Sequence, residues 1–300
     1  KPLGLAQSHS LKALRRLGGQ GRSVYLSEAG REAYGRLLPA MLRDLAGSPQ
    51  PEAALAHFES MLNAAGAFGG FYELFLQDPA TLTLLLQAFG SGSDLAHTMI
   101  AHPEFLDYLG DPALLSEGPD RAAMQGGLDR WLKPAREEGA RCAARVRFKR
   151  FEYLMAVLGE IAGLLDYATA CARMGATAEI VIQSALRDAA AGMGLSAEPR
   201  GFAVLSMGKL GAAELNYHSD LDLIFVWDES FEAGGRPAGE AAHALAEGVV
   251  VLLPYASPEG PAYQLDARLR PEGQNAPLAP PLARYAEYFE RRAQSWEFQS

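Results

Sequence analysis

Apolar residues recur every three or four positions through most of the first 195 residues, which is the spacing of one face of an α-helix. The first clear run extends from Ser27 to a break at Pro49-Gln50-Pro51. Its apolar face consists of Leu37, Leu38, Met41, Leu42 and Leu45. A second face consists of Ala54, Leu55, Phe58, Met61 and Leu62. The pattern therefore predicts two amphipathic helices near the start of a helical region.

Proline and glycine divide the following residues into shorter segments. Breaks at Asp78-Pro79, at residues 90–94 and at His102-Pro103 predict short helices between them. The Ser93-Asp94 pair is a candidate N-cap for a helix over residues 95–101, because a short polar side chain there can accept a backbone hydrogen bond.

Two segments of this half predict no regular structure. Residues 1–26 are basic and contain several glycines, and residues 112–130 are rich in Gly, Pro and Asp. Helical spacing then predicts one long helix over residues 137–170 and another over residues 177–190. The chain up to about residue 195 is therefore expected to be helical wherever it is regular.

The pattern changes at Pro199-Arg200-Gly201, after which short apolar and β-branched runs predict strands. The predicted strands are 202–207, 221–227 and 262–269, and the predicted helices are 240–253 and 281–300. This order predicts an α+β fold, with a helical domain over residues 1–195 followed by a domain with a small mixed sheet over residues 196–300.

Composition narrows the class of protein. A formal net charge of -9 disfavours non-specific binding to nucleic acid. Cys142 and Cys171 have no zinc-ligand or CxxC spacing, so neither a zinc site nor a disulfide framework is expected. Charges interrupt every apolar stretch, so no membrane span is expected. The chain starts at Lys1 and stops at Ser300 inside a predicted helix, so we expect a fragment of a longer cytoplasmic protein, truncated at its C-terminus.

Two carboxylates stand out at the start of the second predicted strand. Asp220 and Asp222 are two positions apart, so both side chains are expected on one face, while Leu221 and Leu223 face the core. Two carboxylates at this spacing repel each other unless a cation lies between them. Oxygen ligands of this kind suit Mg²⁺, which also binds substrate phosphates.

A glycine and lysine segment lies between the first two predicted strands. Gly208 and Gly211 flank Lys209, and glycine allows the backbone to approach a phosphate closely. The segment lacks the order of a Walker A loop, and alone it is weak evidence. Together with the aspartate pair on the next strand, it predicts a site for a nucleoside triphosphate.

A third segment adds one more carboxylate and two guanidinium groups. Asp266, Arg268 and Arg270 alternate along the last predicted strand, so all three are expected on one face. A carboxylate suits a metal ion and guanidinium groups suit phosphate. The same residues could instead form a structural ion-pair ladder, in which the arginines only neutralise the aspartate.

These residues resemble a known family. Gly208-Lys209 followed by Asp220-x-Asp222 and a later strand with Asp266 resembles the DNA polymerase β-type nucleotidyltransferase superfamily. More narrowly, the motifs GKLGxxELNYxSDLDLIF, LDARLRPEG and SWEFQ resemble glutamine synthetase adenylyltransferase, and the helical half is similar in style. The chain departs from the family pattern at Ala212, where Gly is more frequent, and at His218, where Ser is.

The resemblance implies a metal-dependent enzyme that moves AMP from ATP to a tyrosine of glutamine synthetase. Asp220, Asp222 and Asp266 would be the catalytic metal ligands for two Mg²⁺ ions. The implied nucleotide-binding residues are Gly208, Lys209, Ser219, Arg268 and Arg270. The implied partners are glutamine synthetase and a PII-type signalling protein, with neither nucleic acid nor a membrane.

The resemblance leaves the direction of catalysis open, because the family has two related halves. The upstream helical stretch and LDARLRP favour the half that transfers AMP. Met207-Gly208-Lys209, Glu214 to Tyr217 and Arg270 to Gly273 favour the half that removes AMP by phosphorolysis. We expect transfer. The fold could also serve as a non-catalytic nucleotide sensor, or add nucleotides to a nucleic acid, which the acidic charge disfavours.

One basic run remains outside these motifs. It consists of Arg141, Arg145, Arg147, Lys149 and Arg150. A run of this kind is most simply a solvated helix face, and it could also be a site for phosphate or an acidic partner.

Overall fold

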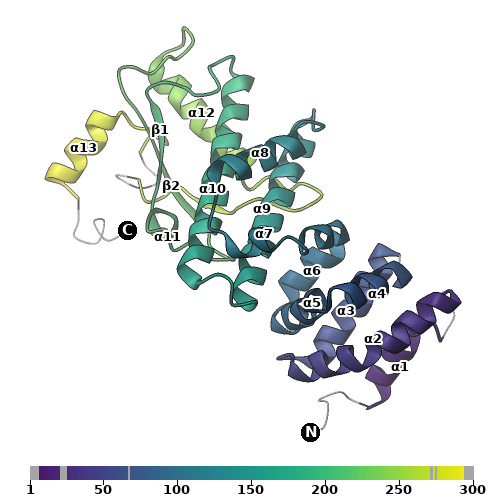
Figure 1. The fold of residues 1–300 in the computed structure, drawn as a ribbon. Helices are drawn as coiled ribbons and strands as arrows, with labels where there is room; N and C mark the ends of the chain where they lie inside the picture. Colours follow the sequence, from purple (N-terminus) through teal and green to yellow (C-terminus); the bar gives the residue numbers. More distant parts are fainter. Residues whose placement is uncertain (1–6, 21–25, 67, 271–272, 274–275, 294–300) are drawn as a thin grey trace. The chain divides into compact units, whose positions relative to one another are not determined.

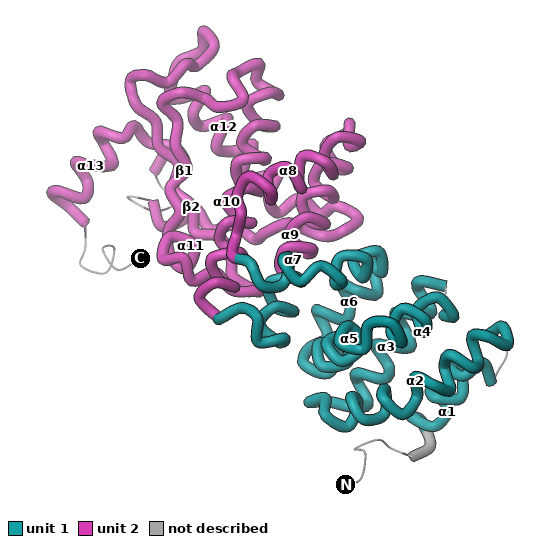
Figure 2. The backbone as a smooth tube through the Cα atoms, in the orientation of Figure 1, with its two compact units in different colours: residues 1–117, 154–166 teal, residues 118–153, 167–300 magenta. Residues whose placement is uncertain are grey.

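The computed structural model describes residues 7–20, 26–66, 68–270, 273 and 276–293 (Figure 1). It confirms the predicted α+β class, with helices in the first part of the chain and a small mixed sheet in the second. The chain forms two compact units (Figure 2). The first contains residues 1–117 and 154–166, and the second contains residues 118–153 and 167–300. A domain division at residue 195 stays a prediction.

The first unit is built from helices. Their bounds are α1 Gln7–Leu17, α2 Glu28–Gly47, α3 Pro51–Ala65, α4 Phe68–Gln77, α5 Pro79–Ser91, α6 Ser93–Ala101, the 3₁₀ helix η1 Pro103–Tyr108 and α7 Pro112–Ser116. Ser27 caps α2 by accepting a hydrogen bond from the Gly30 amide at 3.1 Å. The predicted apolar face of α3 is buried in full, which confirms the periodicity argument.

The second unit combines helices with the sheet. Its elements are α8 Arg121–Leu132, α9 Glu138–Ile161, α10 Tyr167–Gly192, β1 Phe202–Ser206, α11 Gly208–Gly211, β2 Leu221–Trp227, α12 Ala238–Leu252, β3 Leu265–Asp266 and α13 Leu282–Arg291. Helix α9 continues beyond residue 153 into the first unit. Helix α10 packs against α8 and α12, and α12 also contacts β2.

The sheet has the order β1-β2-β3, with β2 in the centre. Strand β1 runs antiparallel to β2, and β3 runs parallel to it. Leu221, Leu223, Ile224 and Phe225 of β2 are all completely buried, which explains the continuous apolar run in the sequence. The sheet is therefore anchored by its central strand, whose predicted bounds of 221–227 are confirmed.

Several expectations for the helical part were wrong. Residues 112–130 form α7 and α8 rather than a loop, because Asp111 and Asp120 cap the two helices with side-chain hydrogen bonds. Helix α6 starts at Ser93 after an uncapped Gly92, so Ser93-Asp94 is not its N-cap. Residues 7–17 are helical rather than irregular, while residues 1–6 and 21–25 lie outside the described part.

Other elements are shorter than expected. The helix predicted over residues 137–170 is divided into α9 and α10, because the chain turns at Gly163, whose φ is 70°. The strand predicted over residues 262–269 pairs only at Leu265 and Asp266. The last helix ends at Arg291, and residues 294–300 lie outside the described part.

The basic run is only partly solvated, with Arg147 exposed and its other members buried or half-buried. Arg145 is fully buried, and both Arg141 and Arg145 form ion pairs with Asp188 of α10. Arg147 and Arg150 both pair with Glu259. The residues are basic because the segments packed against α9 supply carboxylates, which local sequence patterns do not reveal.

Among the described residues, no helix combines the length and the apolar character that a membrane crossing needs.

Two glycines allow a matched test of how β1 begins. Gly201 and Gly235 have φ values of 75° and 80°, but only at Gly201 would a Cβ atom contact backbone, lying 2.4 Å from the Phe231 nitrogen. We expect Gly235→Ala to lower the free energy of unfolding by about 1–2 kcal/mol and Gly201→Ala by more than about 3 kcal/mol. Urea denaturation measures both values, and equal losses would contradict the close approach.

Candidate functional site

The pairing of β2 with β3 places two aspartates side by side. Asp266 lies 44 positions after Asp222 in the sequence, yet the two are direct partners in the parallel ladder. The Leu221 amide donates to the Gln264 carbonyl at 3.0 Å and fixes this register. Partners on adjacent strands are about 5 Å apart and share a face of the sheet. The register therefore brings together two of the three predicted carboxylates.

The third carboxylate interacts electrostatically with Asp222. Asp220 lies just before β2 and is exposed, rather than within the strand as expected. Burial raises the pKa of Asp222, and the negative charges of Asp266 and Asp220 raise it further. Both other aspartates thus affect the pKa of Asp222, as expected of carboxylates that lie in one region.

Asp266 is neutralised by an arginine two positions later. Arg268 donates from Nε to both carboxylate oxygens, at 3.0 and 2.9 Å, and its Nη2 also contacts Oδ2. The Arg268 amide donates to Oδ1 at 2.8 Å. These hydrogen bonds, the side-chain ones first, lower the pKa of Asp266. An ion pair of the kind expected in a structural ladder is therefore present in this segment.

The donor set can be tested for its fit to a metal ion. Three carboxylates with mutual repulsion offer the hard oxygen ligands that Mg²⁺ binds. As the side chains stand, however, the described residues contain no group of three or more His, Cys, Asp or Glu side chains arranged to hold a metal ion. Arg268 occupies both oxygens of Asp266, so metal binding there would require its guanidinium group to move. The metal assignment stays a prediction.

Gly208 lies directly against the Asp222 carboxylate. Its φ is 54°, and a Cβ atom at this position would lie 2.4 Å from Asp222 Oδ2. The Met207 amide also donates to the Asp222 carbonyl at 2.9 Å, which ties the two segments together. No larger residue fits here without displacing the carboxylate, so the glycine is required by the geometry of the site.

A cavity of about 520 Å³ opens at the glycine and lysine segment. Its lining includes Gly208, Lys209 and Gly211. Lys209 is exposed, and its ammonium group has no carboxylate partner among the described residues. Glu214 also lines the cavity, whereas none of the three aspartates does, and Gly208 connects it to the Asp222 carboxylate. The cavity provides space and the positive charge of Lys209, as a phosphate group requires.

The remaining predicted nucleotide-binding residues have other partners in this structure. The Ser219 hydroxyl donates to Asn216 Oδ1 at 2.6 Å and accepts from the Asn216 amide at 3.2 Å, closing the turn before Asp220. Arg270 donates to the carbonyls of Ala267 and Ala276, at 2.5 and 3.3 Å. Contacts of either residue with a nucleotide stay predictions.

A cluster that was not predicted from the sequence joins α9 to both aspartate-bearing segments. Tyr217 donates to the Tyr153 carbonyl at 2.6 Å, and the Tyr153 and Tyr263 hydroxyls are 3.1 Å apart. Lys149 donates to the Ala262 carbonyl at 2.7 Å, with its ammonium group 4.0 Å from the centre of the Tyr263 ring. In the sequence, the feature that could have indicated this cluster was a tyrosine three positions before an aspartate, at Tyr217 and at Tyr263.

The segment that contains this site matches a known family. The family model described as glutamate-ammonia ligase adenylyltransferase matches residues 82–300. The chain belongs to this family. The match covers the sheet, all three aspartates and the glycine and lysine segment.

Curated relatives agree with the family match. A Stenotrophomonas maltophilia protein is 34% identical over 291 residues, covering 94% of this chain and 31% of the relative. Proteins of Xanthomonas axonopodis pv. citri and Mycobacterium avium are 32% and 30% identical, over 92% and 93% of this chain and 30% and 29% of their own lengths. Each is named a bifunctional glutamine synthetase adenylyltransferase/adenylyl-removing enzyme. The chain thus spans about a third of these relatives' length.

The lysine of the cluster gives a prediction about pH. Burial first, and then Arg150, lowers the pKa of Lys149 to about 8. The unfolded state therefore binds more protons between pH 8 and 10, so this group makes the free energy of unfolding rise with pH in that window. The raised pKa values of the buried tyrosines act in the opposite direction only above pH 10.

Lys149→Met removes this titration. Relative to the variant, the wild type is expected to gain about 2 kcal/mol of stability between pH 8 and 10. Urea denaturation at several pH values measures the difference, with Lys12→Met, an exposed lysine of α1, as the control. Parallel pH profiles for wild type and Lys149→Met would show that the ammonium group is not desolvated.

Proposed function

We propose that this chain transfers AMP from ATP to a tyrosine of glutamine synthetase and so regulates that enzyme. The register that sets Asp222 opposite Asp266 carries the proposal, because it gathers acidic ligands next to a cavity with a lysine. Membership of the adenylyltransferase family and the names of the relatives supply the substrate. The enzyme class is nucleotidyltransferase.

Asp220, Asp222 and Asp266 would hold two Mg²⁺ ions, which would neutralise the triphosphate and lower the pKa of a bound hydroxyl group. The tyrosine oxygen forms a bond to the α-phosphorus, and the bond from that phosphorus to pyrophosphate breaks. Asp266 accepts the tyrosine proton. Lys209 places positive charge next to the departing pyrophosphate, and Gly208 keeps the backbone close to the phosphates.

Arg268 has two roles in this proposal. Without substrate it neutralises Asp266, and with ATP bound it leaves the carboxylate and contacts a phosphate together with Arg270. The side chain of Arg268 is 69% exposed, so its ion pair is weak and the exchange costs little. Ser219 would contact phosphate in the same way, by giving up its hydrogen bonds to Asn216.

The phosphorolytic half of the family is the second candidate, because the relatives' names include adenylyl removal. The same carboxylates would serve, with inorganic phosphate in place of the tyrosine. A PII-type signalling protein as a further partner and a cytoplasmic location stay predictions, and a non-catalytic nucleotide sensor is the more remote alternative.

The direct test offers the chain both reactions. The protein is incubated with Mg²⁺ and labelled ATP plus unmodified glutamine synthetase, or with phosphate plus adenylylated glutamine synthetase. Label on glutamine synthetase supports transfer, while release of ADP from the adenylylated form assigns the chain to the removing half. Binding of ATP without either reaction would favour the sensor.

Asp222→Asn separates a metal ligand from a structural carboxylate. The amide keeps the shape of the side chain but removes a charge that Asp266 and Asp220 repel, so stability without metal should stay equal or rise slightly. Transfer should fall by ~10³-fold or more, because a metal ligand is lost. Thermal unfolding and the labelled ATP assay measure the two effects. Near-normal transfer by Asp222→Asn would contradict the proposed site.

A further inference from the structure

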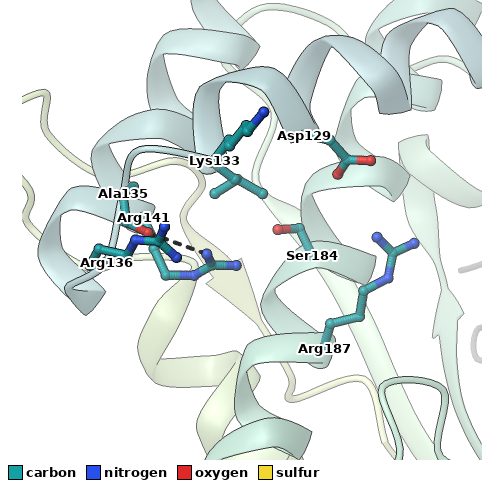
Figure 3. A pocket seen from close by; sticks show the side chains of 8 residues that line it. Asp129, Lys133, Ala135, Arg136, Arg141, Ser184 and Arg187 are labelled. Carbon is teal, nitrogen blue, oxygen red and sulfur yellow. Dashed lines mark hydrogen bonds between the residues drawn. The ribbon is translucent and has the colours of Figure 1, made fainter.

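A second cavity lies among the helices of the second unit, with a volume of about 390 Å³ (Figure 3). The end of α8, the connection to α9, the first turn of α9 and the C-terminal half of α10 surround it. Its charged and hydroxyl-bearing lining residues are Asp129, Lys133, Arg136, Arg141, Ser184 and Arg187. None of them belongs to the proposed catalytic set.

Positive charge dominates this lining. Four of its side chains are cationic and one, Asp129, is anionic. Asp129 accepts a hydrogen bond from Gln125 at 2.9 Å on its own helix. Glu137 and Glu138 are close in sequence but do not line the cavity. This concentration of cations contrasts with the net charge of -9 on the chain as a whole.

Three of the cations have no carboxylate partner among the described residues. These are Lys133, Arg136 and Arg187, of which Arg187 is half-buried. Arg141 forms a two-pronged ion pair with Asp188, with both contacts at 2.7 Å. Asp188 also neutralises the fully buried Arg145, so its single charge serves two arginines. Asp129 and the shared Asp188 therefore compensate the positive charge of this cavity only in part.

Ser184 adds a directed donor on the wall of the cavity. Its hydroxyl accepts from Arg145 Nε at 3.0 Å, and no described acceptor receives its own proton. The side chain is buried, and it lies between Arg141 and Arg187 in Figure 3. Guanidinium, ammonium and hydroxyl groups are all hydrogen-bond donors, and together they match a ligand whose oxygens are all acceptors.

We infer that this cavity binds a small anion that carries a phosphate group or several carboxylates. Gathering like charges around a concavity costs free energy unless an anion offsets it. A volume of about 390 Å³ lies within the range of small-molecule sites, which favours a metabolite-sized anion over a protein segment. Binding here is separate from nucleotidyl transfer and does not depend on it.

Isothermal titration calorimetry of the full chain tests the inference. The titrants are inorganic phosphate, pyrophosphate and citrate, at constant ionic strength so that screening does not differ between them. EDTA is present to suppress metal-dependent binding of phosphates at the aspartates. At least one titrant is expected to bind at millimolar concentration or better, and the comparison of phosphates with citrate identifies which oxyanion the cavity selects.

Charge-removing variants locate the binding. Arg136→Gln and Arg187→Gln should each weaken it by at least tenfold, because each removes a charged donor. Arg136 is exposed, so its variant is expected to fold normally. Arg130→Gln is the matched control, since Arg130 is an exposed residue of α8 outside the lining, and it should change affinity less than twofold.

Asp222→Asn should leave this binding unchanged, which separates failure here from failure of the catalytic proposal. The inference is overturned if none of the three anions binds, or if binding is equal in wild type, Arg136→Gln and Arg187→Gln. Binding of an acidic peptide without binding of any small anion would also overturn it.

Discussion

The parallel register of β2 and β3 is the constraint on which the site depends, because it forces two like charges onto adjacent positions. The backbone of Asp222 cannot move away from Asp266, because Leu221 and Leu223 on either side are completely buried and hold the strand in the core. Burial raises the pKa of Asp222, and the negative charges of Asp266 and Asp220 raise it further. Carboxylates that are held close together are stabilised by a positive charge beside them.

Arg268 supplies one such cation from within the chain. It binds both oxygens of Asp266, and its positive charge also opposes the repulsion felt by Asp222. An exposed guanidinium group is a replaceable partner, whereas the backbone contacts around Asp222 are not. Gly208 has no side chain, and a Cβ atom at its position would clash with the Asp222 carboxylate. The site thus combines a rigid side, at Gly208 and Asp222, with an exchangeable side at Arg268.

Sequence patterns predicted those features whose causes are local. The run of β2 is continuously apolar and the face of α3 is periodic, and both were located correctly. Helices α7 and α8 were not predicted, because aspartate is common both in loops and at helix N-termini. Here Asp111 and Asp120 cap the two helices. The three aspartates were named from their spacing and from family resemblance. The pairing of Arg268 with Asp266 is local, and the spacing of the two residues had offered it as an alternative. The register of the aspartates and the partners of the basic run depend instead on contacts between distant segments, which no local pattern encodes.

Helix α9 shows why those distant contacts matter. Arg141 and Arg145 bind it to α10 through Asp188, while Arg147 and Arg150 bind it to the segment at Glu259. Lys149 holds the Ala262 carbonyl, four positions before Asp266, and Tyr153 accepts from Tyr217, three positions before Asp220. One helix therefore sets the positions from which both aspartate-bearing segments enter the sheet. Helical residues outside the predicted site thus help to position its carboxylates.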